Sequence, residues 1–306
     1  MKNNVLLVGY GSIGRRHVRN LIGLGIKPYV LTRHPDNTKA EFIDDIKELK
    51  NIKIGYCIIS SSTARHLDDL LNILKFSNSF KNMLIEKPLE CSYVRGKKIQ
   101  SMATLKKLHI FVAYNLRFLR AFNFIRRFIR EQGDKIRIVE VVAGQDLKEW
   151  RPDRDLRESY SASRGQGGGV DLDLSHEIDY IFWLFGNKLR NKFIYRTKVS
   201  NLQITSPDVF KAVLDYKSFL LDITLDYIRK PKERYLRIIC EGSQELHCDF
   251  ISGIVRRKER VILGNNNDMD RSYQRMLKAF LGIDKKNRAK LCTLGEALNI
   301  LKFLAV

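Results

Sequence analysis

Three groups of residues in this sequence combine side-chain types and spacings that suit chemistry. Gly9, Gly11 and Gly14 follow an apolar run near the first residue, in the spacing G-x-G-x-x-G. Lys87 follows another apolar run, and His176 lies in a helical pattern that begins after three consecutive glycines. A glycine turn can hold an anion with backbone N–H groups, a lysine can hold an oxygen, and a histidine can transfer a proton near neutral pH.

The glycine turn has the order of a dinucleotide-binding motif. The Val- and Leu-rich run before it predicts a buried parallel strand, and the pattern after it predicts a helix. Gly9 permits the tight turn, Gly11 lets the backbone approach a pyrophosphate, and Gly14 lets the helix pack close to the strand. The amino terminus of that helix presents N–H groups and a partial positive charge. A glycine turn with a purely structural role is the alternative.

Lys87 is placed by the predicted topology. In a doubly wound sheet, ligands bind outside the carboxyl ends of the strands, so the loops after the first, third, fourth and fifth strands face one crevice. These loops carry the segments 9–14, 60–63, 86–88 and 115–117. The Lys87 ammonium could hold a substrate oxygen or lower the pKa of a neighbouring acid. The alternative is a surface lysine at the end of a strand.

His176 lies in a predicted helix over 170–185. At about 100° per residue, the apolar side chains fall on one face, and Asp173, His176 and Tyr180 fall together on the other. Because the helix is otherwise apolar, a solvated face explains this histidine poorly. We therefore expect His176 to act in proton transfer to or from a hydroxyl, with Asp173 orienting its ring. A histidine satisfied by packing is the alternative.

The elements that position these residues alternate between strands and helices in the first third of the chain. This alternation predicts a parallel sheet with helices on both faces. The expected strands are 28–32, 54–60, 83–85 and 110–114 after the first, and the expected helices are 12–24, 39–49, 63–76 and 92–108.

The pattern changes after residue 117. A helix over 118–130 and a strand over 136–143 precede the long polar stretch 145–166, which is more typical of a functional loop than of a linker. Strand-like runs joined by short turns then predict an antiparallel sheet. These runs are 191–199, 209–216, 219–228, 235–241 and 246–251, and helices over 270–281 and 293–304 follow.

Composition limits the class of protein. The 306 residues include 44% hydrophobic residues, suiting one large domain or two. No apolar stretch reaches the roughly 18 residues of a membrane helix, and no signal-peptide pattern precedes the glycine turn. Five cysteines without a C-x-x-C pair favour a reduced, cytoplasmic setting, and no standard zinc spacing is present, so no metal is expected.

The net charge of +21 is spread along the chain rather than held in a tail. Residues 1–117 hold 20 basic and 9 acidic side chains, and residues 118–306 hold 35 and 25. A basic surface without a special role, an anionic substrate and nucleic-acid binding all fit this excess. The short basic clusters are not interleaved with aromatic residues, so nucleic acid is the weakest of the three interpretations.

Four motifs occur in order along nearly the whole chain, at 9–17, 86–88, 114–118 and 167–180. In this order they resemble the Gfo/Idh/MocA oxidoreductases, which include glucose-fructose oxidoreductase and inositol dehydrogenase. The stretch 150–163 is similar to a branch often linked to bacterial surface-sugar biosynthesis.

The resemblance implies a Rossmann domain over 1–117 and an α/β domain over 118–306 with an open, mostly antiparallel sheet. The outer face of that sheet commonly forms a homodimer, and the last helix, 293–304, would pack back on the first domain. The implied reaction is hydride transfer between a nicotinamide and a hydroxyl or ketone carbon of a sugar or nucleotide-sugar.

The resemblance also implies roles for individual residues. His176 would exchange the hydroxyl proton, Lys87 would hold the same oxygen, and Asp173 would orient His176. Many relatives carry the acid four residues before the histidine, where this chain has Leu172, so Asp171 is a possible substitute. The residues implied in substrate binding are Lys87, Arg117, Tyr160, Asp173 and His176. Those implied in cofactor binding are Gly9, Gly11, Ser12, Ile13, Gly14, Arg15, Thr32, Arg33, Ser60, Ser61, Glu86, Lys87 and Asn115.

The choice between NAD and NADP depends on the end of the second strand. An acid there normally binds the ribose 2′-hydroxyl, but no acid occurs before Asp36. Thr32 and Arg33 suit a 2′-phosphate better, and Arg15 could add to them. NADP is therefore the preferred cofactor. A nucleotide-sensing regulator without catalysis is the competing function, although Lys87 and His176 argue against it.

Overall fold

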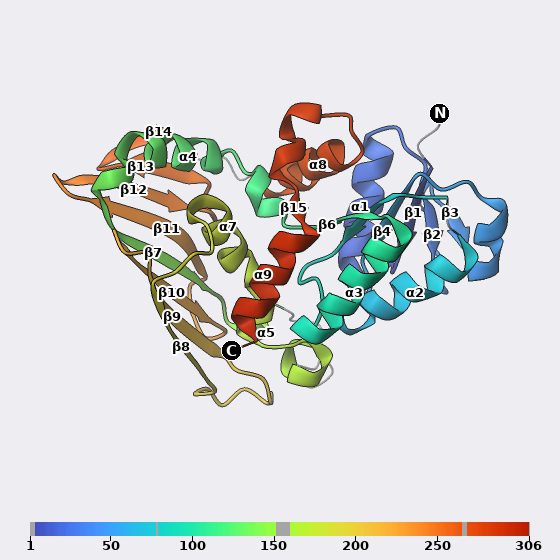
Figure 1. Cartoon of the computed structure of the whole chain (residues 1–306), viewed down its shortest axis with the longest axis horizontal. Helices are drawn as coiled ribbons and strands as arrows, with labels where there is room; N and C mark the ends of the chain where they lie inside the picture. The colour runs from blue at the N-terminus through green and yellow to red at the C-terminus, as the bar shows by residue number, and fades with distance from the viewer. Residues whose placement is uncertain (1–3, 78, 151–159, 265–267, 306) are drawn as a thin grey trace. The chain divides into compact units, whose positions relative to one another are not determined.

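The computed structural model describes residues 4–77, 79–150, 160–264 and 268–305 (Figure 1). The chain divides into two compact units, one formed by 1–118 with 270–305 and the other by 119–269. The expected division at 117/118 therefore differs in residues 270–292, which join the first unit. The reason is packing, because Tyr273, Met276 and Phe280 belong to the same hydrophobic cluster as the first strand.

The first unit contains a seven-stranded sheet in the order β15-β6-β5-β4-β1-β2-β3. Its six amino-terminal strands are all parallel, and their order 3-2-1-4-5-6 is that of a Rossmann fold, which confirms the predicted fold class. The strands are β1 Val5–Val8, β2 Tyr29–Leu31, β3 Glu41–Ile43, β4 Tyr56–Ile59, β5 Asn82–Ile85 and β6 His109–Val112, with β15 Cys292–Thr293 antiparallel to β6.

The helices of this unit are α1 Ser12–Gly23, α2 His66–Phe76, α3 Tyr93–Lys106, α8 Met269–Phe280 and α9 Leu294–Leu304. Gly96 of α3 allows close packing with α9, since an added Cβ would lie 2.9 Å from Leu301 Cδ1 and 3.0 Å from Leu298 Cδ2. None of the helices in the described parts of the chain combines the length and the apolarity needed to span a membrane.

The predicted helix over 39–49 is wrong. Glu41–Ile43 instead forms β3, which pairs with β2 at the edge of the sheet, and a 3₁₀ helix follows over Ile46–Asn51. Asp45 and Glu48 form a capping box at the start of that short helix. Phe42, Ile46 and Leu49 have a helix-like spacing, but pairing with β2 overrides this local preference.

The second unit contains an eight-stranded sheet in the order β14-β13-β12-β11-β7-β10-β9-β8. Its pairs are antiparallel except β7–β10, which is parallel, so the prediction of a mostly antiparallel sheet is confirmed. The strands are β7 Ile136–Gly144, β8 Asn191–Thr197, β9 Val209–Asp215, β10 Leu220–Asp226, β11 Glu233–Cys240, β12 Gln244–Asp249, β13 Ile254–Arg257 and β14 Arg260–Leu263.

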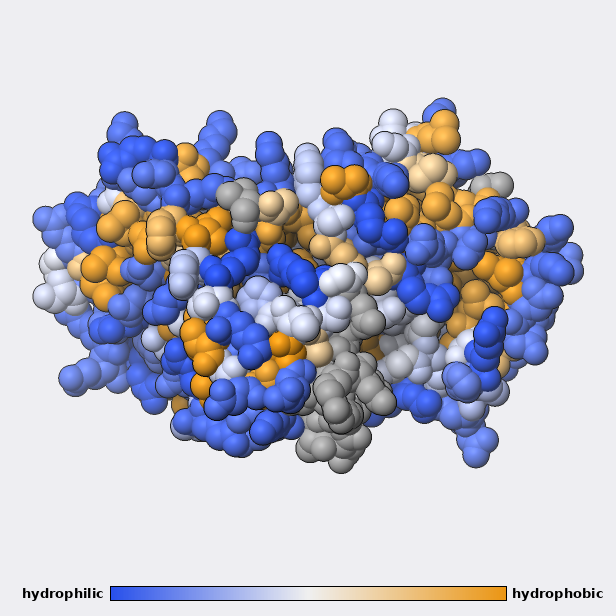
Figure 2. Space-filling view, turned by 90° about the horizontal axis from the view of Figure 1, so that it is seen from below, coloured by the Kyte–Doolittle hydropathy of each residue, from blue (hydrophilic) through white to orange (hydrophobic). Residues whose placement is uncertain are grey.

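The helices of the second unit are α4 Ala121–Gln132, α5 Leu147–Trp150, α6 Val170–Asp173 and α7 Ser175–Phe185. The single helix expected over 170–185 is therefore divided at Leu174, whose φ of −99° and ψ of 29° depart from helical geometry. Figure 2 shows hydrophilic residues over much of this face, with hydrophobic patches between them.

Candidate cofactor site and active site

Two of the three glycines in the turn after β1 are required by the chain's own packing. Gly9 has a φ of +91°, and an added Cβ would lie 2.4 Å from the Ser61 backbone nitrogen. A Cβ on Gly14 would lie 2.1 Å from the Gly9 carbonyl oxygen. Ser60 completes the turn, because its hydroxyl donates to the same Gly9 oxygen at 2.7 Å. The turn is thus locked to the loop that follows β4.

Gly11 differs from the other two, because an added Cβ would meet nothing within 4 Å. It is the N-cap of the twelve-residue helix α1, which begins with Ser12 and Ile13, has no side-chain cap among the described residues and has no acid in its first turn. The hydroxyl oxygen of Ser61 is buried and has no hydrogen-bond partner in the described parts of the chain. Open space, uncapped N–H groups and an unsatisfied hydroxyl fit the pyrophosphate of a dinucleotide.

This contrast predicts different results for two substitutions. Gly11→Val should keep the melting temperature within a few degrees and weaken cofactor binding by about 100-fold, because the new side chain enters only the open space. Gly14→Val should lower the melting temperature strongly, since overpacking against backbone costs about 1–3 kcal/mol or more. Thermal melts and cofactor titrations of both variants measure this. Unchanged affinity in a folded Gly11→Val protein would contradict the role of the turn.

An acidic side chain also reaches the glycine turn. Asp36 accepts hydrogen bonds from the Tyr10 hydroxyl at 2.9 Å and pairs with Arg15 Nη1 at 2.6 Å. Burial opposes ionisation, but the hydrogen bonds from Thr38 and Tyr10 and the charge of Arg15 lower the pKa of Asp36. Its ion pair is therefore present above the usual carboxyl pKa and is lost as the pH falls through the lowered value. Sequence reasoning missed this contact, because Asp36 lies five residues beyond β2.

The residues chosen for a 2′-phosphate lie at the end of β2. Thr32 accepts a hydrogen bond from the His34 backbone at 3.1 Å, and Arg33 is exposed. Arg15 is half-exposed and is already paired with Asp36. Arg33 is therefore better placed than Arg15 to receive an added anion.

Lys87 follows β5 at the sheet edge that also carries the glycine turn. Backbone hydrogen bonds from Ser60 to Val8 and from Glu86 to Ile59, both of 2.8 Å, bring these loops together. The buried Glu86 accepts the Lys87 backbone N–H at 3.1 Å, and its other oxygen lies 2.7 Å from His17 Nε2. The predicted grouping of the glycine turn, Ser60, Glu86 and Lys87 is thus observed within the first unit.

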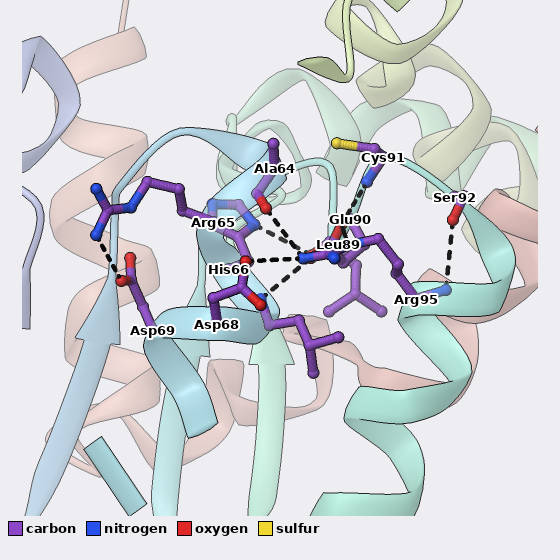
Figure 3. Close-up of polar contacts among 11 residues, drawn as sticks. Ala64, Arg65, His66, Asp68, Asp69, Leu89, Glu90, Cys91, Ser92 and Arg95 are labelled. Carbon is purple, nitrogen blue, oxygen red and sulfur yellow. Dashed lines mark hydrogen bonds and ion pairs between the residues drawn. The ribbon is translucent and has the colours of Figure 1, made fainter. Parts of the chain in front are cut away.

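The segment after Lys87 is held by buried charge (Figure 3). Glu90 is fully buried and accepts hydrogen bonds from the Leu67 backbone at 3.1 Å and from Arg95 Nε at 3.0 Å. Arg95 also donates to the Ala64 carbonyl at 3.0 Å. The segment that carries Lys87 is therefore tied to α2 and α3 by side chains that sequence reasoning did not select.

Asn115 and Arg117 lie in a 3₁₀ helix, Asn115–Phe118, after β6. Each is only 1% exposed. Asn115 Nδ2 donates to Ser272 Oγ at 2.7 Å, and Arg117 pairs with Glu296 at 3.0 Å. Both residues thus fix the carboxyl-terminal helices α8 and α9 to the loop after β6.

His176 lies in the first turn of α7, in the second unit, and is 7% exposed. Asp173 and Tyr180 are also buried, which confirms that this face of the helix is not solvated. Asp173 Oδ2 accepts hydrogen bonds from Ser161 Oγ at 2.6 Å and from the Tyr227 hydroxyl at 2.7 Å. Two hydroxyls thus fix the carboxylate that was predicted to orient His176.

Two further carboxylates hold the α6–α7 bend. Asp171 pairs through one oxygen with Arg164 at 2.6 Å and through the other with Arg196 at 2.9 Å, so it serves an ion-pair network. Glu177 binds Arg234 through two hydrogen bonds of 2.8 and 3.1 Å. A cavity of about 270 Å³ adjoins the bend and is lined partly by Trp150, Leu174 and Arg234. Sequence reasoning missed Ser161, Tyr227 and Arg234, because they are distant in the chain.

The side chain of Tyr160, predicted to bind substrate, lies outside the described residues, as does most of the stretch 150–163. The adjacent Ser161 is fully buried and supplies one of the hydrogen bonds to Asp173.

Comparisons with known proteins agree with this architecture. A scan of protein-family models and a search of curated proteins found no match. Among solved structures, the WlbA dehydrogenase from Bordetella pertussis in complex with NADH and UDP-GlcNAcA aligns with a TM-score of 0.80 and 16% identity, over 100% of this chain and 95% of that one. UDP-N-acetylglucosamine 3-dehydrogenase GnnA from Acidithiobacillus ferrooxidans aligns with a TM-score of 0.74 and 15% identity, over 99% of this chain and 97% of that one.

GenD2 from gentamicin A biosynthesis, in complex with NAD, aligns with a TM-score of 0.78 and 15% identity, over 100% of this chain and 93% of that one. At these identities the similarity shows the fold. The fold that the resemblance implies is therefore confirmed over nearly the whole chain.

Proposed function

We propose that the protein is a nicotinamide-dependent oxidoreductase that transfers a hydride between its cofactor and a hydroxyl or ketone carbon of a sugar or nucleotide-sugar. The observation that carries this proposal is the open space at Gly11, next to an uncapped helix and an unsatisfied Ser61 hydroxyl. Lys87 follows a strand at the same sheet edge, which is where a doubly wound sheet binds its ligand.

The residue roles follow from their chemistry. When bound, the nicotinamide supplies or accepts the hydride. In oxidation, neutral His176 takes the hydroxyl proton, and in reduction the imidazolium returns it. The Lys87 ammonium holds the same oxygen and stabilises the negative charge that develops on it. Asp173, fixed by Ser161 and Tyr227, orients the His176 ring.

The experiment that tests this proposal follows absorbance at 340 nm while the protein and cofactor are mixed with sugars and nucleotide-sugars. Turnover of one compound in the panel, lost in the His176→Ala variant, would support it. Cofactor binding without turnover, together with selective binding to a protein or to DNA, would instead favour a nucleotide-sensing regulator.

We propose NADP as the preferred cofactor. The exposed Arg33 and the hydroxyl of Thr32 support this choice, and Arg15 already compensates the charge of Asp36. Arg33→Ala is expected to weaken NADPH binding by about tenfold, because hydrogen bonds to charged groups contribute about 1.5–3 kcal/mol, and to leave NADH binding unchanged. Fluorescence titrations of this variant and of the exposed control Lys39→Ala measure both. Tighter binding of NADH by the unaltered protein would contradict the preference.

We propose a homo-oligomer, most simply a dimer, formed through the outer face of the eight-stranded sheet. Paired positions on this sheet expose large apolar side chains, among them Phe193 beside Val213 and Leu220 beside Ile138. Phe193 is 64% exposed. Contiguous exposed apolar side chains are typical of interaction surfaces.

Phe193→Asp should therefore halve the mass measured by sedimentation, from twice the 35.6 kDa of the chain to the single value. Leu105→Asp, an exposed position on α3 of the first unit (72%), lies outside this sheet, so it is the matched control and should leave the mass unchanged. A monomeric unaltered protein would rule out this surface as a stable interface.

We propose a cytoplasmic location, supported by five cysteines that are all free thiols. Cys91 is the one that is not fully buried, and its burial together with the charge of Glu90 raises its pKa to about 11. The Cys91 thiol is therefore protonated at neutral pH, and none of the five cysteines is paired in a disulfide.

A further inference from the structure

His66 joins the two loops that the proposed function uses in the first unit. It is the first residue of α2 and is 1% exposed. Its Nδ1 lies 3.1 Å from the Leu89 carbonyl oxygen, two residues after Lys87. Its Nε2 lies 3.2 Å from the carbonyl oxygen of Ser61, in the loop that packs on Gly9. Figure 3 shows the ring between α2 and the segment after β5.

The two partners of this ring determine which hydrogens it carries. A backbone carbonyl oxygen accepts hydrogen bonds and cannot donate them. A neutral imidazole would direct one lone pair at one of these oxygens, so both contacts are satisfied only when both nitrogens carry a hydrogen. The species that fits the geometry is the imidazolium cation.

The charged groups around His66 can compensate this cation. The buried carboxylates Asp69, one turn along α2, and Glu90, after β5, are the anions. Each is partly engaged, Asp69 with Arg65 at 3.2 Å and Glu90 with Arg95 at 3.0 Å. Asp68, also on α2, is largely exposed and pairs with Arg95 at 3.3 Å.

The Lys87 segment is held from both sides. Before Lys87, Glu86 receives its backbone N–H and contacts His17. After it, the Leu89 carbonyl oxygen lies 3.1 Å from His66 Nδ1, and Glu90 accepts a hydrogen bond from the Leu67 backbone. Among these contacts, the His66 ring is the one that also reaches the loop at Ser61.

We propose that His66 is a positioning residue that couples the cofactor loop at Ser61 to Lys87, through an imidazolium whose two N–H groups hold the carbonyls of Ser61 and Leu89. This proposal rests on the proposed role of Lys87. His66 touches neither the cofactor nor the reacting oxygen; it fixes the backbone from which Lys87 extends.

Two substitutions of His66 test its contact with Leu89 and its contact with Ser61 separately. The amide nitrogen of asparagine can replace Nδ1, and that of glutamine can replace Nε2. His66→Asn, which can keep the Leu89 contact, should retain kcat within about threefold and weaken cofactor binding about tenfold. His66→Gln, which can keep the Ser61 contact, should retain cofactor affinity and lower kcat by about 10- to 100-fold, since small misplacements of catalytic groups have effects of this size. His109→Asn, at an exposed position on β6, is the control.

A second readout does not depend on activity. In the unaltered protein, one-bond ¹⁵N–¹H correlation spectra should show two ring N–H groups for His66, assigned by their loss in His66→Asn. A ring with one N–H, or equal losses of kcat and cofactor affinity in both folded variants, would overturn the proposal. A protein with two ring N–H groups but no turnover of any sugar would instead refute the proposed function. If neither variant folds, the ring N–H signals of the unaltered protein are assigned to His66 through their bonds to its ring and side-chain carbons, and their number still decides the protonation.

Discussion

Replacing His176 by alanine is expected to lower kcat by about 10²–10⁴-fold, the usual contribution of a positioned general acid or base. His176 is nearly buried in the first turn of α7, and the neighbouring Asp173 is fixed by Ser161 and Tyr227. We propose that this fixed carboxylate orients the His176 ring toward a substrate hydroxyl. Because the proposed cofactor turn belongs to the first unit, the affinity for the nicotinamide should change less than threefold.

The control for this variant is His247→Ala, which removes a half-buried histidine from β12 in the same unit. It should leave kcat unchanged and shows whether losing any imidazole from this sheet disturbs turnover. Steady-state kinetics and circular dichroism of both variants separate chemistry from folding. Full activity in a folded His176→Ala protein would refute the proton-transfer role.

Replacing Lys87 by alanine is expected to lower kcat by at least 100-fold, because a positioned donor to a developing oxyanion contributes about that much. The backbone around Lys87 is held by Glu86, His66 and Glu90, so truncating the side chain should not collapse the loop. Lys87→Arg should recover little, since the planar guanidinium cannot replace a compact ammonium in a fixed site. Cofactor affinity should remain within about threefold.

Lys98→Ala, an exposed position on α3, is the matched control for lost positive charge. If the activity of Lys87→Ala and Lys98→Ala fell equally, the effect would come from the overall charge of +21 rather than from the site. Measuring kcat at low and high salt distinguishes these cases, because only the overall field is screened.

The first unit was largely predictable because its signals are local. The glycine spacing, the apolar runs and the alternation of strands with helices all lie within short windows, and they gave the correct fold class. The edge strands β3 and β15 were not predictable, since β3 has a helix-like spacing and β15 is only two residues long. β3 forms by pairing with β2 against its own local preference, and β15 forms by pairing with β6, which is far away in the sequence.

The residues of the candidate site could be predicted from the sequence, but the hydrogen bonds and ion pairs that hold them could not. Lys87 and His176 follow recognisable motifs, whereas the partners of Asp173 lie 12 and 54 residues away from it. Asp36 meets Arg15 across 21 residues, and Arg117 meets Glu296 across 179. Such contacts depend on folding of the whole unit, so spacing along the chain carries no signal for them.

The most direct test of the central claim is a titration of the purified protein with NADPH and NADH, followed by nicotinamide fluorescence at physiological salt. We expect micromolar binding of at least one cofactor, tighter for NADPH, and loss of that binding in the folded Gly11→Val variant. No binding of either cofactor would contradict the account, because the open turn at Gly11 would then be a structural feature and the similarity to dehydrogenases would be one of fold alone.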